Sequence, residues 1–408
     1  MSVSCYPGRL HELKEIAFTA LWMSVLLQGL SSHCSAQASP EPEVHPAVVQ
    51  QVVVYREPGR FAGWPANHGF WCWGEELLVG FSRGYHFDHG SAAHNIDHDR
   101  PEDFLLARSL DGGSTWTTEF PNQHGDLIPR GKSLHGTELP GVAVPPLRSC
   151  TRPVELTHLD FAMALRMDDN DGGQSEFSYS YNRGHSWNGP FALPNIEGLK
   201  IAARTDMIVD GANSATVMLT AAKANGREGR VLCARTTDGG QTFRFLSWVN
   251  DEIAGYEIMP STVRISPTHL LTITRVREPN MGKSYLDAYQ SLDNGTSWSY
   301  LNRPVEDTGE GTPPSALRLA DGRICLTYAY RAKPYQILAR LSGDDGQTWG
   351  EPILLRTRGG GRDMGYPRSI QTASGQVVTA YYFWDTPSAP ERYIAATIWD
   401  PKKVGPIP

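Results

Sequence analysis

Residues 109–116 read Ser-Leu-Asp-Gly-Gly-Ser-Thr-Trp, and closely similar stretches recur four times along the chain. Each copy follows the pattern Ser/Thr-x-Asp-x-Gly-x-Thr/Ser-aromatic, with Asn182 in place of the acid in the second. The Asp side chain can accept backbone N–H bonds across a turn, the glycine permits a positive φ, and the aromatic residue can pack beneath as an anchor. The pattern therefore predicts one hairpin turn repeated five times, at residues 109–116, 180–187, 236–243, 291–298 and 342–349.

The spacing of these turns indicates a repeated fold. Successive copies begin about 71, 56, 55 and 51 residues apart, and β-like runs such as residues 104–109 and 337–342 lead into them. Segments of this length fit four-stranded antiparallel blades, and a period of this size is typical of a β-propeller. The predicted fold class is therefore all-β, a propeller of four-stranded blades.

Composition agrees with this fold and excludes several functions. The 408 residues include 40 Gly, 29 Pro, 11 Trp and 16 Tyr, and the net charge is −7. Nothing forms a broad basic footprint, so nucleic acid and anionic membranes are not expected as partners. The sequence contains no phosphate-binding loop, dinucleotide fingerprint, Gly-x-Ser-x-Gly elbow or HExxH zinc motif. We therefore expect no cofactor and no metal, and a monomer.

The N-terminus has the character of an export signal. Residues 16–30 are mostly apolar, follow Arg9 and Lys14, and precede the small-x-small sequence Ala36-Gln37-Ala38. We expect a signal peptide over residues 1–38, a leader over 39–47, the propeller over 48–400 and a tail over 401–408. The protein would then be secreted or periplasmic with no membrane span after cleavage; an uncleaved signal anchor is the alternative. Of the later cysteines, Cys233 and Cys325 lie in β-like runs and are expected to be buried free thiols.

The five turns are Asp-boxes, and the chain from about residue 50 to 400 resembles the sialidase superfamily. This resemblance implies a six-bladed propeller. The sixth blade would form around residues 369–382 and Tyr393–Trp399, and the strand Val48–Tyr55 would pair into it and close the ring. The resemblance also implies an active site in which a Tyr nucleophile works with a Glu base. Three arginines bind the substrate carboxylate, and an Asp acts as general acid and base.

Several positions match that set. Tyr366 in Arg-Asp-Met-Gly-Tyr-Pro-Arg-Ser resembles the nucleophile segment and follows the last box. Glu257 and Arg275 are spaced as the ends of a hairpin and resemble the base and the second arginine, with Arg277 as a two-residue alternative. Arg331 corresponds approximately to the third arginine.

Two positions depart from the family pattern. Gly63, before Trp64-Pro65, stands where the family has its first arginine, and Arg60 or Arg204 could replace it. For the acid, Asp88 follows Arg83 at the family's spacing, but Asp97 and Asp99 compete in the same loop. Arg83 and Arg362 are further candidates for substrate binding.

The His-rich loop after this strand allows a second interpretation. A metal site at His94, Asp97, His98 and Asp99 is conceivable, and a solvated polar loop is the simpler alternative.

The sequence thus predicts an exported glycosidase of the sialidase type. It would hydrolyse a terminal acidic sugar from glycans with retention, through Tyr366. The missing first arginine leaves open a propeller that acts on a uronic-acid-containing polysaccharide as hydrolase or lyase. A non-catalytic glycan-binding propeller is the third possibility.

Overall fold

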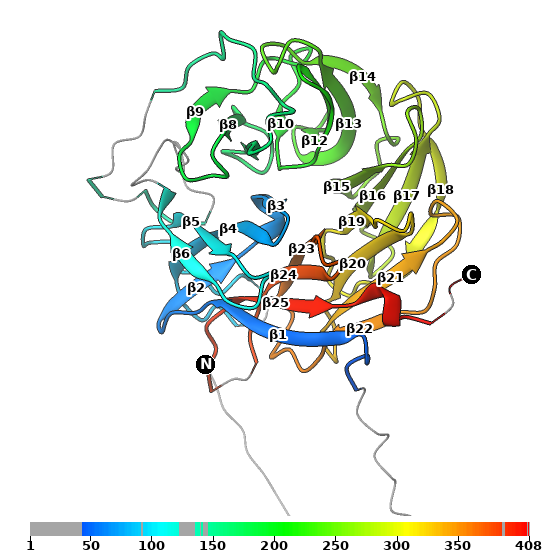
Figure 1. Cartoon of the computed structure of the whole chain (residues 1–408). Helices are drawn as coiled ribbons and strands as arrows, with labels where there is room; N and C mark the ends of the chain where they lie inside the picture. Colours follow the sequence, from blue (N-terminus) through cyan, green and yellow to red (C-terminus); the bar gives the residue numbers. More distant parts are fainter. Residues whose placement is uncertain are drawn as a thin grey trace, which may run out of the picture. The chain divides into compact units, whose positions relative to one another are not determined.

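The computed structural model describes residues 43–90, 93–121, 135–138, 140–141, 146–385, 388–405 and 407. Six antiparallel sheets follow one another around a ring (Figure 1). This confirms the predicted six-bladed propeller. The expected signal peptide and residues 39–42 of the leader lie outside the described residues.

The strands of the first three blades are as follows. Blade one contains β2 (Arg60–Gly63), β3 (Phe70–Trp73), β4 (Glu76–Tyr85), β5 (Asp103–Ser109) and β6 (Thr117–Glu119). Blade two contains β7 (Ala162–Arg166), β8 (Glu176–Ser180) and β9 (Asn188–Ala192). Blade three contains β10 (Ile201–Ala202), β11 (Met207–Gly211), β12 (Ser214–Ala222), β13 (Glu228–Thr236) and β14 (Arg244–Trp248).

The second half of the ring is more regular. Blade four contains β15 (Tyr256–Arg264), β16 (Leu270–Arg277), β17 (Ser284–Ser291) and β18 (Ser299–Val305). Blade five contains β19 (Ser315–Arg318), β20 (Ile324–Tyr330), β21 (Gln336–Ser342) and β22 (Ile353–Arg356). Blade six contains β23 (Gly365–Gln371), β24 (Val377–Phe383), β25 (Tyr393–Trp399) and β1 (Val48–Tyr55).

The ring closes as the sequence predicts. The N-terminal strand β1 pairs antiparallel with β25, with Val52 opposite Ala396, so the last blade contains both ends of the propeller. A sheet edge with unpaired N–H and C=O groups can pair with another chain. The pairing of β1 with β25 covers that edge of the last blade. Two short 3-10 helices, η1 (Pro65–Asn67) and η3 (Pro401–Lys403), complete the elements. No helix in the described part of the chain has the length and apolar character that a membrane crossing needs.

The Asp-box turns have the predicted hydrogen bonds. In the first copy, the Asp111 carboxylate accepts the Thr115 N–H at 2.8 Å and the Thr115 hydroxyl at 2.6 Å. Asn182 makes the corresponding turn in the second copy, accepting the Ser186 N–H at 2.9 Å. The turn therefore depends on an oxygen acceptor at this position and not on the charge.

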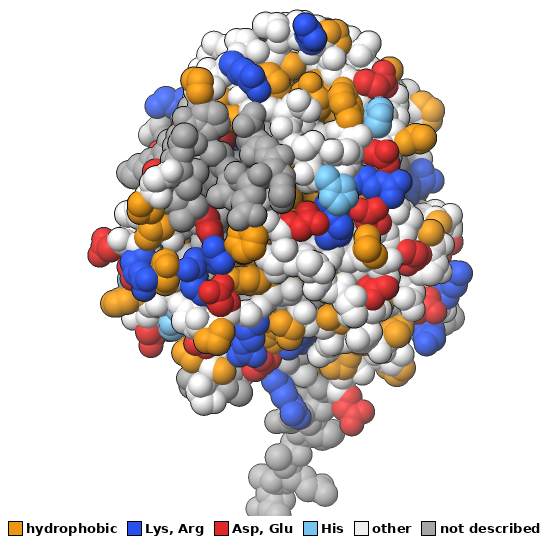
Figure 2. Space-filling model, turned by 60° about the vertical axis from the view of Figure 1, so that its left-hand side comes forward, with side chains coloured by type: hydrophobic (Ala, Val, Ile, Leu, Met, Phe, Trp, Pro, Cys, Tyr) orange, Lys and Arg blue, Asp and Glu red, His pale blue; other side chains and the backbone are white. Residues whose placement is uncertain are grey.

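The core consists of apolar strand residues between neighbouring blades. Leu77, Phe81, Tyr381 and Trp399 are among the fully buried side chains. Cys233 and Cys325 are also fully buried and free, which confirms that prediction, and Cys72 and Cys150 are free as well. On the face turned forward in Figure 2, acidic and basic side chains are interspersed, as the modest net charge suggests.

Two irregularities in inner strands shape the centre of the ring. β15 has a register shift between Ile258 and Ser261, where Met259 has φ 53°. β23 has one between Gly365 and Arg368, where Tyr366 has φ 51°. A non-glycine residue in the left-handed region costs on the order of 1–3 kcal/mol and concentrates at functional sites. Both bulges change the direction of side chains at the centre of the ring.

Candidate active site

Tyr366 lies at the centre of a group of arginines. It is the second residue of β23 and is 8% exposed. Its hydroxyl oxygen accepts a hydrogen bond from Arg275 Nη1 at 3.1 Å. The guanidinium carbons of Arg275 and Arg331 lie 5.9 and 5.8 Å from its ring centre. Residues from blades four, five and six therefore meet at this hydroxyl.

The charges around Tyr366 change its acidity. Burial opposes ionisation of the phenol, but attraction by Arg275, Arg331 and Arg204 outweighs it, so the pKa of Tyr366 is lowered. A lowered pKa increases the fraction of phenolate at a given pH, and phenolate is the form that acts as nucleophile or base. The arrangement thus favours ionisation of this hydroxyl, and no carboxylate is hydrogen-bonded to it among the described residues.

The three arginines are held by different partners. Arg275 Nη2 donates to the Tyr256 hydroxyl at 3.0 Å. Arg331 donates to the carbonyl oxygens of Gly311 at 2.7 Å and Arg362 at 2.6 Å. These acceptors are neutral, and neither Arg275 nor Arg331 has an ion pair within the part of the chain that the structure describes, which suits both to an anionic ligand.

Arg204 comes from blade three, between β10 and β11. Its Nη1 forms an ion pair with Glu228 at 2.6 Å and its Nε donates to Asn67 at 3.2 Å. Its charge contributes to the lowered pKa of Tyr366. Of the two predicted replacements for the missing first arginine, Arg204 is the one that the structure brings to the tyrosine.

Arg60 and Arg83 take part in other contacts. The Arg60 guanidinium carbon lies 3.9 Å from the centre of the Tyr85 ring. Arg83 forms an ion pair with Asp103 at 2.6 Å and one with Glu57 at 3.3 Å. Among the described residues, neither Arg60 nor Arg83 has a hydrogen bond or ring contact with Tyr366.

Glu257, the predicted base, makes its hydrogen bonds away from Tyr366 among the described residues. The Glu257 carboxylate accepts from Thr274 Oγ1 at 2.5 Å, Asn250 Nδ2 at 2.8 Å and the Tyr289 hydroxyl at 3.2 Å. Consecutive strand residues point to opposite sides, so Glu257 and its neighbour cannot both face Arg275. The neighbour, Tyr256, makes that contact. Burial raises the Glu257 pKa to about 7.

A cleft of about 550 Å³ reaches Arg331, whose guanidinium carbon lies 5.8 Å from the Tyr366 ring centre, while Tyr366 itself does not line it. Arg331 and Asp88 line it, together with Trp384. Asp88 Oδ1 accepts from the Gly90 N–H at 2.8 Å and from Asn95 Nδ2 at 3.2 Å. The cleft is also lined by Arg362, Arg392, Lys333, Glu310, Asp363 and Tyr335.

The remaining predicted residues have simpler positions. Arg362 lines the cleft and forms an ion pair with Glu310 at 3.0 Å. Asp97 accepts the N–H of Asp99 at 3.0 Å within their own loop, and neither lines the cleft. Arg277 is exposed at the end of β16. Asp88 is therefore the predicted acid that reaches the cleft.

Sequence reasoning missed a buried carboxylate beside the tyrosine. Asp363 is 3% exposed and accepts from His94 Nδ1 at 2.6 Å and the Tyr382 hydroxyl at 2.9 Å, and it forms an ion pair with Arg392 Nε at 3.0 Å. One signal for Asp363 in the sequence is its place next to Arg362, a candidate arginine near the segment of Tyr366. Nothing local indicated His94 as its partner, because 269 residues separate them.

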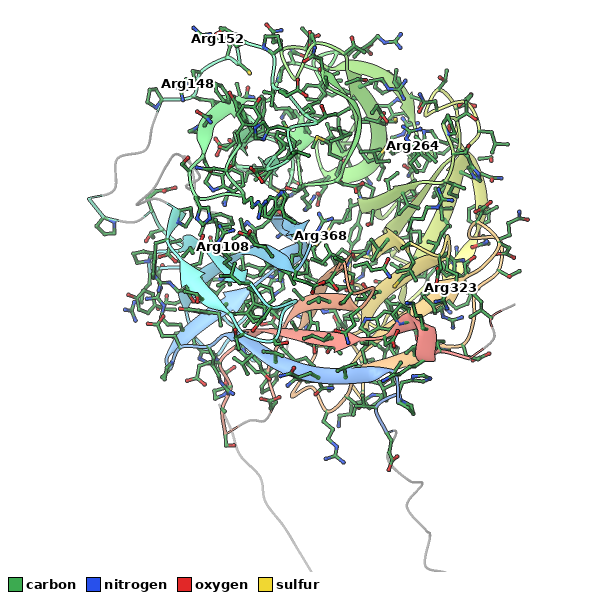
Figure 3. All side chains as sticks on the ribbon, viewed as in Figure 1. Arg108, Arg148, Arg152, Arg264, Arg323 and Arg368 are labelled. Atoms are coloured by element: carbon green, nitrogen blue, oxygen red, sulfur yellow. The ribbon has the colours of Figure 1, made fainter. Side chains whose placement is uncertain are left out.

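Deeper along the axis, Arg368 connects three blades near the centre of the ring (Figure 3). Its Nη2 donates to the carbonyl oxygens of Ala66 and Thr205. Burial raises the pKa of the nearby Asp206 to about 6. Across the described residues, no group of three or more His, Cys, Asp or Glu side chains is placed to hold a metal ion. The alternative metal site at His94, Asp97, His98 and Asp99 therefore does not form among the described residues. His94 instead bonds to the Asp363 carboxylate.

A family model described as BNR repeat-like domain matches residues 163–379, more than half of the chain. The chain belongs to this family. The BNR repeat-like propeller is similar to three solved structures in particular. One is a protein of unknown function from Dyadobacter fermentans, at 22% identity and a TM-score of 0.64, covering 86% of this chain and 98% of the other.

The other two are glycosidases. The NanB sialidase from Streptococcus pneumoniae matches at 12% identity and a TM-score of 0.54, over 87% of this chain and 71% of its own. The α-L-arabinofuranosidase Arb93A from Fusarium graminearum matches at 12% identity and a TM-score of 0.51, over 88% and 99%. At these identities the likenesses show the fold. No curated protein matches the BNR repeat-like chain at a significant level.

Proposed function

We propose that this protein is an exported glycosidase that removes an acidic sugar from glycans with retention, through Tyr366. The observation that carries the proposal is the Tyr366 hydroxyl at 3.1 Å from Arg275, in a group of three arginines that lower its pKa. An anionic sugar would repel a carboxylate nucleophile, whereas a tyrosine can approach it. The fold it shares with a sialidase supports the same conclusion.

The arginines have a second role in this proposal. Arg275 and Arg331 lack acidic partners among the described residues and would bind the sugar carboxylate by charge-assisted hydrogen bonds. Arg204 would supply the third positive charge from blade three. The proton donor is expected from the loop after β4, which reaches the cleft through Asp88.

One observation favours a second candidate, a lyase. Glu257 is hydrogen-bonded to Thr274, Asn250 and Tyr289, and among the described residues no carboxylate is hydrogen-bonded to Tyr366. A phenolate stabilised by arginines could instead remove the proton next to the carboxylate of a uronic acid. The bond to the leaving oxygen would then break by elimination and leave a double bond in the sugar.

The test uses the purified protein on two substrate sets. One set contains fluorogenic glycosides of sialic acid and of its deaminated and shorter acidic relatives, and the other contains uronic-acid polysaccharides. Release of the fluorophore indicates hydrolysis, and ultraviolet absorbance of an unsaturated uronate indicates elimination. Silence on both sets would refute both candidates and favour a glycan-binding propeller.

The matched variants are Tyr366→Phe and Tyr300→Phe. Tyr366→Phe should lose turnover by several orders of magnitude, because no other group replaces the hydroxyl. It removes one charge-assisted hydrogen bond, so the free energy of unfolding should change by only about 1–3 kcal/mol. Tyr300 is 55% exposed, and its variant should behave as wild type. Retained activity in Tyr366→Phe would refute the assignment of the nucleophile.

A further inference from the structure

His94 and Asp363 form a hydrogen-bonded pair beside the candidate active site. His94 lies in the loop that follows β4, and Asp363 lies two residues before β23. His94 Nδ1 and Asp363 Oδ1 are 2.6 Å apart, and Asp363 Oδ2 accepts the backbone N–H of Asn95 at 3.1 Å. One carboxylate therefore fixes both the imidazole and the backbone next to it.

The carboxylate of this pair is held rigidly and in its charged form. Asp363 also accepts from Tyr382 at 2.9 Å and forms an ion pair with Arg392 at 3.0 Å, so three hydrogen-bond donors and one guanidinium surround it. Burial alone would raise its pKa, but the hydrogen bond and charge of His94 and the charges of Arg392 and Arg331 hold that pKa well below its usual range. A fixed anion at Nδ1 orients the imidazole.

The other ring nitrogen of His94 is available. Its Nδ1 is taken by Asp363, and Nε2 has no hydrogen-bond partner among the described residues. The side chain is 29% exposed, so Nε2 is not sealed in the core. The Trp64 ring packs edge-on against the imidazole with centroids 5.1 Å apart and restricts its rotation. An imidazole that is oriented at one nitrogen and accessible at the other has the arrangement of a general acid and base.

Tyr382 connects the His94–Asp363 pair to Tyr366. The Tyr382 hydroxyl donates to Asp363, and the Tyr382 ring lies 5.9 Å from the Tyr366 ring. Asp363 lines the same cleft as Arg331, whose guanidinium lies over Tyr366. The carboxylate that orients His94 thus lines the cleft together with Arg331, one of the arginines around Tyr366.

The neighbours of His94 include one further titratable group. The His135 ring lies 5.8 Å away and stacks on Trp64. Burial lowers the pKa of His135 to about 4. It is therefore neutral around neutral pH and adds no positive charge beside the imidazole.

We propose that His94, oriented by Asp363, is the proton donor and acceptor for the glycosidic oxygen, a role that the sequence had suggested for Asp88. This inference rests on the proposed function and specifies its chemistry. Asp363 is a positioning residue. Asp88 instead accepts the Gly90 N–H and the Asn95 side chain and so holds the loop in shape.

The proposed reaction has two displacement steps at the anomeric carbon. The Tyr366 phenolate forms a bond to the anomeric carbon while the bond from that carbon to the leaving oxygen breaks, and His94 Nε2–H gives its proton to the leaving oxygen. Neutral His94 then takes a proton from water as the water oxygen bonds to the anomeric carbon. The tyrosyl bond breaks and restores the phenolate. The sugar is released as a free acid sugar with its configuration retained.

The experiment compares His94→Gln with wild type on two glycosides of one acidic sugar. One has an activated aryl leaving group that departs without a proton, and the other has an alkyl or sugar leaving group that needs one. Loss of a general acid should lower kcat/KM on the second substrate by on the order of 10²–10⁴-fold and much less on the first. Gln can still donate to Asp363, so the thermal unfolding temperature should stay close to wild type.

Two further variants separate the alternatives. His98→Gln lies in the same loop, where its Nδ1 bonds the His135 carbonyl oxygen, and should behave as wild type on both substrates. Asp88→Asn should lower both rates by a similar small factor. Leaving-group-dependent loss in Asp88→Asn and not in His94→Gln would overturn the inference and assign the acid to Asp88.

The remaining outcomes are also decisive. An equal loss on both substrates in His94→Gln, with a lowered unfolding temperature, would make His94 a structural residue and refute its catalytic role. Full activity in His94→Gln would refute it too, while the proposed function would stand. A wild-type protein inert on both glycosides would refute the proposed function itself and, with it, this inference.

Discussion

The raised pKa of Glu257 predicts how the free energy of unfolding depends on pH, whatever the substrate is. The Glu257 carboxyl is 2% exposed, and burial raises its pKa from 4.5 to about 7. At about 1.4 kcal/mol for each pKa unit, this difference corresponds to roughly 3 kcal/mol. The folded state holds the proton over a pH range in which the unfolded state has lost it. Stability from this group is therefore complete below about pH 4.5 and is lost as pH rises through about 7.

The perturbation is Glu257→Gln, which keeps the shape of the side chain and removes its titration. Urea unfolding at several pH values between 5 and 8.5 gives the free energy of unfolding of each protein. Wild type should lose roughly 3 kcal/mol more than the variant across this range. Glu306→Gln, at a side chain that is 72% exposed, should keep the wild-type pH dependence.

The same variant tests the catalytic role predicted from sequence. If Glu257 is the base of Tyr366, Glu257→Gln should lose most activity, as a Tyr366 variant does. The contacts with Thr274, Asn250 and Tyr289 instead predict that turnover falls by less than about tenfold. An identical pH dependence of stability in variant and wild type would refute the assignment of the raised pKa to this group.

Two further predictions concern the scaffold. Asp344→Ala in the fifth Asp-box removes the acceptor for Ser342 and for the Thr348 N–H and hydroxyl, and should destabilise the protein by about 2 kcal/mol in urea unfolding. Asp344→Asn should cost much less, as the second box shows, and equal losses in the two variants would contradict this. Gly365→Ala should lower both the unfolding temperature and kcat, because a Cβ there would lie 2.5 Å from the Ala329 Cβ at φ 105°. A fully active variant of wild-type stability would contradict the tight approach of β23.

The local part of this fold could be predicted because its interactions are local. In each Asp-box the acceptor and its donors lie within four residues of each other, as in Asp111 and Thr115. The four-stranded blades followed from the spacing of the boxes, whereas the count of six blades and the closing strand β1 followed from the resemblance to the sialidase superfamily. None of these conclusions required knowledge of contacts between distant segments.

The site could be predicted only in part, since one-residue differences decide it. The hairpin that ends at Arg275 was correctly placed at the centre of the ring. Strand alternation and the bulge at Met259 decide whether Tyr256 or Glu257 faces that arginine, and the sequence does not show the bulge. The pairing of His94 with Asp363 across 269 residues had no sequence signal at all.

The two departures from the sialidase pattern are physically connected. Trp64 follows the position of the missing arginine, has φ 59° and is 1% exposed. Its ring packs against His94 and stacks on His135 with centroids 4.0 Å apart. A large buried ring there excludes an arginine side chain from blade one and fixes the histidine loop instead.

Blade three, through Arg204, supplies the positive charge that the sialidase pattern places in blade one. Arg204 enters from blade three, so the three arginines around Tyr366 come from blades three, four and five. A carboxylate held by this set would be displaced toward blade three relative to one held from blade one. With the leaving oxygen at His94 and the anomeric carbon at Tyr366, the preferred sugar should carry its carboxylate at a different place from sialic acid. On this reasoning the changed arginine alters which acidic sugar fits and preserves the use of a tyrosine to attack it.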